Sequence, residues 1–278
     1  MFEAGQYPRV LQPKGCAPIA SVPSCTREVE DLCRSMDEAQ PDPVCGARGA
    51  PHNPGVRQLV EAKRECHYQP SREDLRRGFR GWYERGYLPH FDAPNITQFV
   101  TFMLGDSFPV WRRREWEPLL REPDQSVRRR KLEAWLDRGH GACWLRRPEV
   151  ARRIEEIVRA EDGRLYQLQA WVLMPNHVHV VVDVWQTPLC RLLNQWKGES
   201  AHDANQLLGR RGAFWQKDGF DTYIRDVEHR ARAIHYMEHN PLKGLLVRDP
   251  KQWLWGSARW RDKHNRLPWQ IELNTRTR

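Results

Sequence analysis

Residues 164–184 constrain the fold of this chain more than any other stretch. They read RLYQLQAWVLM, then Pro175-Asn176, then HVHVVVDV. Two runs of apolar and β-branched residues separated by a short turn predict an antiparallel hairpin of two buried strands. Because side chains alternate along a strand, one face of the first strand is expected to carry Tyr166, Leu168, Ala170, Val172 and Met174.

The segments around this hairpin predict further strands and helices. The run QFVTFML, from Gln98, is typical of a buried strand, and 214–225 is typical of a hairpin or short strands. Helices are expected over 146–163, from Thr187-Pro188 onward and over 226–240, whereas Pro118 and Pro123 should interrupt any helix between 111 and 136. This order predicts an α+β fold with helices on one face of an antiparallel sheet.

Residues 1–75 differ from the rest and are predicted to be a weakly structured N-terminal extension. Nine of the 20 prolines lie before residue 71, whereas all 13 tryptophans lie between Trp82 and Trp269. Apart from a possible helix over 26–36, this region has too little apolar periodicity to offset the entropy of ordering it. We therefore expect a folded domain over 76–265 and a basic C-terminal tail over 266–278.

The cysteines and the chain ends carry little functional signal. The cysteine count is odd, no CxxC pair occurs and the spacing is irregular, which favours free thiols over disulfides or a zinc site. No apolar run reaches the roughly 20 residues of a membrane span, and the N-terminus lacks the apolar core of a secretion signal, so an intracellular location is expected. The seven cysteines are Cys16, Cys25, Cys33, Cys45, Cys66, Cys143 and Cys190.

Composition points to a polyanionic partner. The formal net charge is +9 and the isoelectric point is near 9.4. Nucleic acid is the commonest polyanion that a basic protein binds. Thirteen tryptophans are many for 278 residues. They are expected either to stack on unpaired bases or to fill the core.

The sequence His177-Val178-His179 lies on the second predicted strand. Alternation places both imidazoles on one face, followed by Val181 and Asp183. Two neutral imidazoles at this spacing can bind one divalent metal, although two polar residues on a solvated strand face fit the pattern too. The opposite face is apolar and predicted to be core: Val178, Val180, Val182 and Val184.

The helix predicted over 226–240 carries a second candidate group. With Val227 set at 0° and about 100° per residue, Ala231 and Ile234 share its face, which predicts the buried stripe. Tyr236 falls near 180° and Asn240 near 220° by the same count. The tyrosine is therefore expected opposite the core, either as a chemical group or as an ordinary surface residue.

Five blocks of the chain, between Phe79 and Trp260, resemble the REP-associated tyrosine transposases. These proteins belong to the single-strand, one-tyrosine branch of the HUH nucleases. The blocks occur in the family's order: FRGWYERGYLPHFDAPNITQFVTFML, LDRGHGACWL, AWVLMPNHVHVVV, LLGRRGAFWQKDGFDTYIRD and YMEHNPLKGLLVRDPKQWLWGSARW.

The resemblance implies a ferredoxin-like HUH nuclease domain that cleaves and rejoins single-stranded hairpin DNA. It implies that Tyr236 is the nucleophile and forms a 5′-phosphotyrosine. Mg²⁺ or Mn²⁺ would be bound by His177, His179 and Asn240, with Asp183 near the ligands and no evident general base. Met237, where the family often has Ile, and Leu245, near its usual Ala-Gly, are departures that leave these residues intact.

The DNA contacts implied around these motifs are less specific. The arginine runs 112–114 and 128–130 are expected to be solvated faces or a hairpin-binding surface. Trp215 is expected in the core, with base stacking as the other reading, while Pro188, Trp253 and Trp255 are expected to cap and pack. Seven basic residues are candidates for phosphate contacts: Lys197, Arg210, Arg211, Lys217, Arg225, Arg232 and Lys243.

Two other functions use the same residues differently. A domesticated protein could bind a REP-like DNA hairpin without turnover, although binding alone does not need the His pair, Tyr236 or Asn240. A zinc hydrolase of small substrates would leave the basic charge without a role. The resemblance favours a monomer, with a homodimer as the alternative, in the cytoplasm and associated with the nucleoid of a prokaryote.

Overall fold

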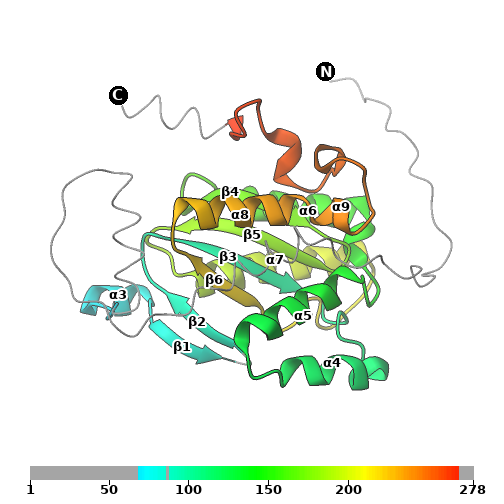
Figure 1. Ribbon diagram of the computed structural model, residues 1–278, viewed down its shortest axis with the longest axis horizontal. Helices are drawn as coiled ribbons and strands as arrows, with labels where there is room; N and C mark the ends of the chain where they lie inside the picture. Colours follow the sequence, from blue (N-terminus) through cyan, green and yellow to red (C-terminus); the bar gives the residue numbers. More distant parts are fainter. Residues whose placement is uncertain (1–67, 86–87, 269–278) are drawn as a thin grey trace.

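A four-stranded antiparallel sheet organises the residues that this computed structural model describes, 68–85 and 88–268 (Figure 1). The spatial order of its strands is β4-β5-β3-β6. The strands are β3 (Ile96–Met103), β4 (Tyr166–Leu173), β5 (His177–Val184) and β6 (Phe220–Ile224). With α6 (Pro148–Arg159) and α7 (Leu189–Leu207), they run β-α-β-β-α-β along the chain. This is the ferredoxin-like order, so the predicted α+β class is confirmed.

Helices α6 and α7 cover one face of the sheet. Val150, Ile154, Ile157 and Val158 of α6 are buried there, as the apolar stripe predicts. They pack with Leu192 and Trp196 of α7 on the valines of β5, and this cluster is the main core of the domain. The valines are Val178, Val180, Val182 and Val184.

The opposite face of the sheet carries α5 (Gln125–Asp137), α8 (Val227–Glu238) and the short α9 (Asn240–Lys243), as Figure 1 shows. Ala233 and Met237 of α8 are buried against Phe99 and Val181 of the sheet. The expectation of helices on one face therefore holds for α6 and α7 and is wrong for α5 and α8. Apolar residues surround the two histidines on this face of the sheet. Without helices to cover the face, these apolar side chains would be exposed to water.

Strand β4 departs from simple alternation at a β-bulge. Its register against β5 shifts between Leu168 and Ala170. As a result Tyr166 and Leu168 face the α6 and α7 layer, whereas Ala170 and Val172 face α8, as Met174 beyond the strand also does. The prediction that these five side chains share one face is wrong, because a bulge inserts one residue and reverses the faces beyond it.

Smaller elements flank the sheet. The hairpin of β1 (Gly81–Arg85) and β2 (Leu88–Asp92) follows α3 (Arg72–Arg77), a helix that crosses the predicted boundary at residue 75. Helix α4 (Arg113–Leu120) contains Pro118, whereas Pro123 lies in the break before α5. Short 3-10 helices span Val110–Arg112, Trp144–Arg146, Pro250–Gln252 and Ser257–Trp260.

Several expectations concern the chain ends. The helix over 26–36 and the cysteines before residue 67 lie outside the described residues. Leu267, in the predicted tail, is buried in the main core. In the described part of the chain, neither Cys143 nor Cys190 forms a disulfide. No helix in the described part of the chain is both long and apolar enough to cross a membrane.

Candidate metal and tyrosine site

The two histidines of β5 lie under α5 and α8, near the middle of the sheet. His177 pairs with Met103 and His179 with Thr101 of β3. Both side chains are buried at 1% exposure, and their Nε2 atoms are 3.1 Å apart. The pair is therefore not on a solvated strand face, and its two Nε2 atoms are in direct contact.

Hydrogen bonds on the far side of each ring fix this arrangement. Asn176 donates from Nδ2 to the carbonyl oxygen of His140, so its Oδ1 is turned to accept the Nδ1–H of His177 at 2.8 Å. His177 then carries its proton on Nδ1 and keeps a lone pair on Nε2. The Nδ1 atom of His179 lies 2.7 Å from Thr101 Oγ1, a contact of the kind that orients metal-binding histidines.

Burial keeps both rings neutral. It lowers the pKa of His177 well below its usual value, and the nearby His179 adds to the effect. Burial lowers the pKa of His179 to about 3, with further contributions from the positive charges of Arg129 and Lys243. Neutral imidazole is the form that binds a metal, so the pair is in the binding form at neutral pH.

The amide of Asn240 is the third candidate ligand. It is 1% exposed, and neither its Oδ1 nor its Nδ2 has a hydrogen-bond partner among the described residues. A buried amide without partners is costly and rare in folded proteins. Over the same described residues, no three His, Cys, Asp or Glu side chains form a metal-binding group. An amide oxygen is a ligand type that Mg²⁺ and Mn²⁺ accept.

Helix α8 brings Tyr236 to the histidines, but not on the face that the wheel predicts. Val227 is 45% exposed and Ala231 is also exposed, whereas Tyr236 is 3% exposed. The ring of Tyr236 lies edge-on to that of His179, with centroids 6.4 Å apart. Of the predicted buried stripe only Ile234 packs on the sheet; the prediction is wrong for Val227 and Ala231, because the side of α8 that faces the sheet carries His229, Ala233, Tyr236 and Met237.

Helix α5 contributes residues that the sequence did not single out. The Tyr236 hydroxyl donates to Glu133 Oε2 at 2.9 Å, and Arg129 Nε donates to Glu133 Oε1 at 3.1 Å. Both α5 side chains are buried. The only sequence signal for them is the spacing of four residues between Arg129 and Glu133, which is common on solvated helices and predicts no site.

Two further charges border the site. Asp137 Oδ1 lies 3.7 Å from His177 Nε2. Burial raises the pKa of Asp137 to about 7, the carboxylate of Glu133 adds to the rise, and Lys243 opposes it. Lys243 Nζ lies 3.8 Å from the centre of the Tyr236 ring. Of the seven predicted phosphate contacts, it is the one in contact with the tyrosine.

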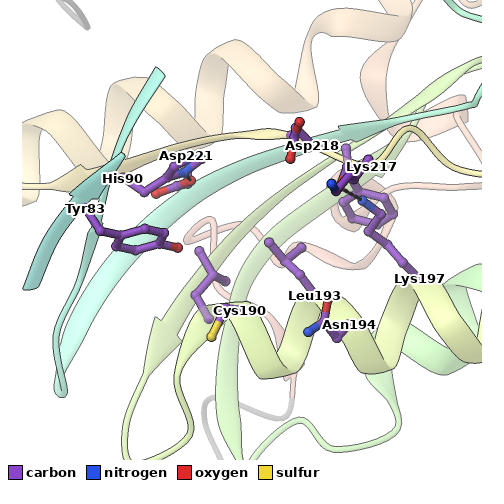
Figure 2. A pocket seen from close by; sticks show the side chains of 12 residues that line it. Tyr83, His90, Cys190, Leu193, Asn194, Lys197, Lys217, Asp218 and Asp221 are labelled. Carbon is purple, nitrogen blue, oxygen red and sulfur yellow. Dashed lines mark hydrogen bonds and ion pairs between the residues drawn. The ribbon is translucent and has the colours of Figure 1, made fainter. Parts of the chain in front are cut away.

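Other predicted residues lie elsewhere. Asp183, expected near the ligands, accepts hydrogen bonds from Thr97 and Gln169 instead, each at 2.6 Å. Figure 2 shows Lys197 and Lys217 at one end of a pocket lined by α7, with His90 toward the other end. This pocket is on the α7 side of the sheet, across from the histidine pair.

The remaining basic candidates are spread over the surface. Lys197 Nζ donates to the backbone carbonyls of residues 216 and 217, at 2.6 and 2.9 Å, so part of its role is to hold that loop. Arg210 lies over the rings of Trp144 and Phe214, and Arg225 over that of Tyr223. Arg211 is exposed, and Arg232 is partly buried.

The arginine runs are not uniform. Arg112 and Arg113 form ion pairs along α4, in keeping with a solvated face. In the run 128–130, Arg129 is buried, so the expectation of a solvated face is wrong for this residue. The reason is the pairing of its guanidinium with Glu133, together with a hydrogen bond to Thr222 Oγ1.

The expected core residues are confirmed. Trp215 is buried between Phe102 and Phe214 and donates from Nε1 to Ser200 Oγ. Pro188 precedes the first residue of α7. Trp253 donates to the carbonyl oxygen of Leu173, and Trp255 packs on the main core.

Comparison with known proteins gives distant structural similarities. No family model matches the chain, and no curated protein matches it. The structure of a REP-associated tyrosine transposase bound to a REP hairpin is 15% identical with a TM-score of 0.39, over 63% of this chain and 81% of that one. A protein from Deinococcus radiodurans, assigned as a transposase, is 15% identical with a TM-score of 0.30, over 57% and 96%. Neither similarity assigns an activity to this chain.

Proposed function

We propose that this protein is a metal-dependent transposase or endonuclease that cleaves and rejoins single-stranded hairpin DNA through a 5′-phosphotyrosine on Tyr236. One observation carries the proposal. Side chains that are far apart in the sequence meet in a single buried cluster, where the Tyr236 ring lies edge-on to His179, the Nε2 atoms of His177 and His179 are 3.1 Å apart, and the Tyr236 hydroxyl donates to Glu133. Packing of the core does not require these polar side chains to lie together, and residues of a solvated surface would not be buried.

The residues fit a divalent metal. His177 and His179 present Nε2 atoms 3.1 Å apart, close to the separation of two ligands on one ion with bonds of about 2.1 Å at a right angle. The unpartnered amide of Asn240 supplies an oxygen of the type that Mg²⁺ and Mn²⁺ accept. When bound, such an ion polarises a phosphodiester and stabilises the negative charge on its oxygens.

The chain supplies the nucleophile and positive charge. The phenolic oxygen of Tyr236 attacks the phosphorus, and the bond from phosphorus to the 3′ oxygen breaks. The covalent link conserves the ester, so another 3′-hydroxyl can reverse the step and join a new strand. Lys243 and Arg129 place two positive charges beside the histidines, where they favour an anionic phosphate.

Burial sets a condition on this reaction. Because Tyr236 is almost fully enclosed, the scissile phosphate reaches its hydroxyl only when a covering side chain moves. Lys243, over the tyrosine ring, is attracted to phosphate and is the residue we expect to move. The net charge of +9 accounts for attraction of the DNA as a whole.

The test is formation of a covalent adduct between the protein and a labelled single-stranded hairpin. Wild type should form the adduct with Mg²⁺ or Mn²⁺ and none with a chelator. Tyr236→Phe should form none, because it lacks the attacking oxygen. Tyr223→Phe is the matched control, since this ring packs with Trp82 and Phe91 away from the histidines, and it should react normally.

Two results would contradict the proposal. An adduct that persists in Tyr236→Phe would move the nucleophile elsewhere. Hairpin binding by wild type without any adduct, under every metal supplied, would favour a DNA-binding protein that lacks turnover.

A further inference from the structure

We propose that Glu133 is the general base of this site and takes the phenolic proton of Tyr236 during cleavage; this inference rests on the proposed function. The hydroxyl of Tyr236 already donates to Glu133 Oε2 at 2.9 Å. A general base must be within hydrogen-bond reach of the proton it removes, and Glu133 is.

The surroundings hold Glu133 in place. Its side chain is 5% exposed, and its other oxygen accepts from Arg129 Nε. Arg129 is itself held over the ring of Phe99 and against Thr222. A buried carboxylate is costly unless it is paired, and Arg129 supplies the partner and orients the group. The carboxylate is thereby fixed with one oxygen on the nucleophile.

Helix α5 is the element that delivers these groups. Arg129, Glu133 and Asp137 recur every four residues, which puts them on one side of the helix. Each makes a contact on the histidine-bearing face: Arg129 with Phe99, Glu133 with Tyr236 and Asp137 with His177. Three charged residues aimed at one buried site are not needed to pack a helix, since Leu132 and Leu136 do that.

Transfer of the phenolic proton to Glu133 accompanies attack of Tyr236 on the phosphorus. The O–H bond of Tyr236 breaks and its proton moves to Glu133 Oε2, while the phenolic oxygen forms a bond to phosphorus. The bond between phosphorus and the 3′ oxygen breaks, and that oxygen leaves with the electron pair and takes a proton from water. In the rejoining step Glu133 returns its proton to the departing phenolic oxygen, since the same group must serve both directions.

A purely structural Glu133 is the competing explanation. In that case the carboxylate would only tie α5 to α8. The two explanations differ in one measurable respect. If Glu133 is a base, a small carboxylate added to the solution can replace it, and the rate of adduct formation should depend on the basicity of that carboxylate. If Glu133 is only structural, the rate should not depend on the carboxylate added. Glu155 is a matched control, because it is equally buried but bonded to Trp171 and Arg259 on the other face of the sheet.

The experiment measures single-turnover adduct formation on a labelled hairpin with Mg²⁺. For Glu133→Ala we expect the rate to fall about 10²–10⁴-fold. Formate, acetate and propionate should restore part of the lost rate, and the restored rate should be higher for the more basic carboxylates. Glu155→Ala should keep its rate per folded molecule and show no response to carboxylates. Glu133→Gln keeps the shape of the side chain but cannot take the proton, so its rate of adduct formation should also be low. This variant tests the inference if Glu133→Ala does not fold.

Full activity of Glu133→Gln, or a defect in Glu133→Ala that no carboxylate relieves, would overturn the inference. Wild type is the internal reference. If wild type forms no adduct at all, the proposed function fails; if wild type reacts and Glu133→Gln reacts equally well, only the assignment of the base fails.

Discussion

Replacing Thr101 by Val should weaken metal binding at the histidine pair without removing any ligand. Thr101 is buried on β3, opposite His179, and its hydroxyl is the hydrogen-bond partner of the Nδ1 atom. Valine has nearly the same shape but no hydroxyl. The Nδ1 atom of His179 would then lose the hydroxyl that orients the ring, so Nε2 would lose part of its availability to a metal.

The magnitude follows from the contact. A buried donor or acceptor left without a partner costs about 1–3 kcal/mol of folding free energy. Loss of the partner that orients a metal-binding histidine lowers metal affinity by about 10–100-fold. That range corresponds to about 1.4–2.8 kcal/mol of binding free energy. We therefore expect Thr101→Val to lose both stability and affinity, each by roughly this amount.

Thr97→Val is the matched control. Thr97 lies on the same strand and donates to Asp183 at 2.6 Å, away from the histidines. It should lose a similar amount of stability in denaturant unfolding and retain wild-type affinity in a calorimetric Mn²⁺ titration. The reasoning fails if Thr101→Val binds Mn²⁺ as wild type does, or if Thr97→Val loses affinity equally.

Two further predictions concern other parts of the molecule. Burial raises the pKa of Asp92 to about 7, above its unfolded value, so its contribution to stability is present at low pH and is lost as pH rises through 7. Asp92→Asn should therefore stabilise the protein relative to wild type more at pH 8.5 than at pH 5 in urea unfolding; an equal difference at both pH values would refute this. Trp111 is 80% exposed beside Arg112. If it stacks on an unpaired base, Trp111→Ala should weaken single-stranded DNA binding by about 1–3 kcal/mol, measured by fluorescence anisotropy, whereas an unchanged affinity would exclude it from the DNA-binding surface.

The sequence predicted the elements of the fold because local patterns specify them. The apolar stripe of α6 and the β-branched runs of β4 and β5 are signals within a single element, and the structure has each of them at the expected place. The bulge in β4 was not predictable in this way. It depends on the pairing of β4 with β5, and the residue at the shift, Gln169, is an ordinary strand residue in sequence.

The helix wheel for α8 failed for a different physical reason. It took apolar residues as the buried stripe, which assumes that the surface under the helix is apolar. The surface under α8 is largely apolar, but the side of the helix that covers it carries Ala233, Tyr236 and Met237, so Val227, on which the wheel was anchored, is left in solvent. The prediction of one helix carrying both Tyr236 and Asn240 is also wrong, because α8 ends at Glu238 and Asn240 begins α9, although both side chains are buried.

Glu133 shows what a single sequence cannot provide about a site of this kind. Arg129 and Glu133 are four residues apart on a helix rich in arginine, a pattern that most often describes solvated ion pairs of little consequence. Only the packing of α5 onto the histidine-bearing face turns this pair inward and places a carboxylate on the tyrosine. The histidines and the tyrosine have chemistry that marks them in a sequence, whereas a carboxylate becomes a base through what it contacts. The proposed general base is thus the part of the site that depends most on tertiary structure.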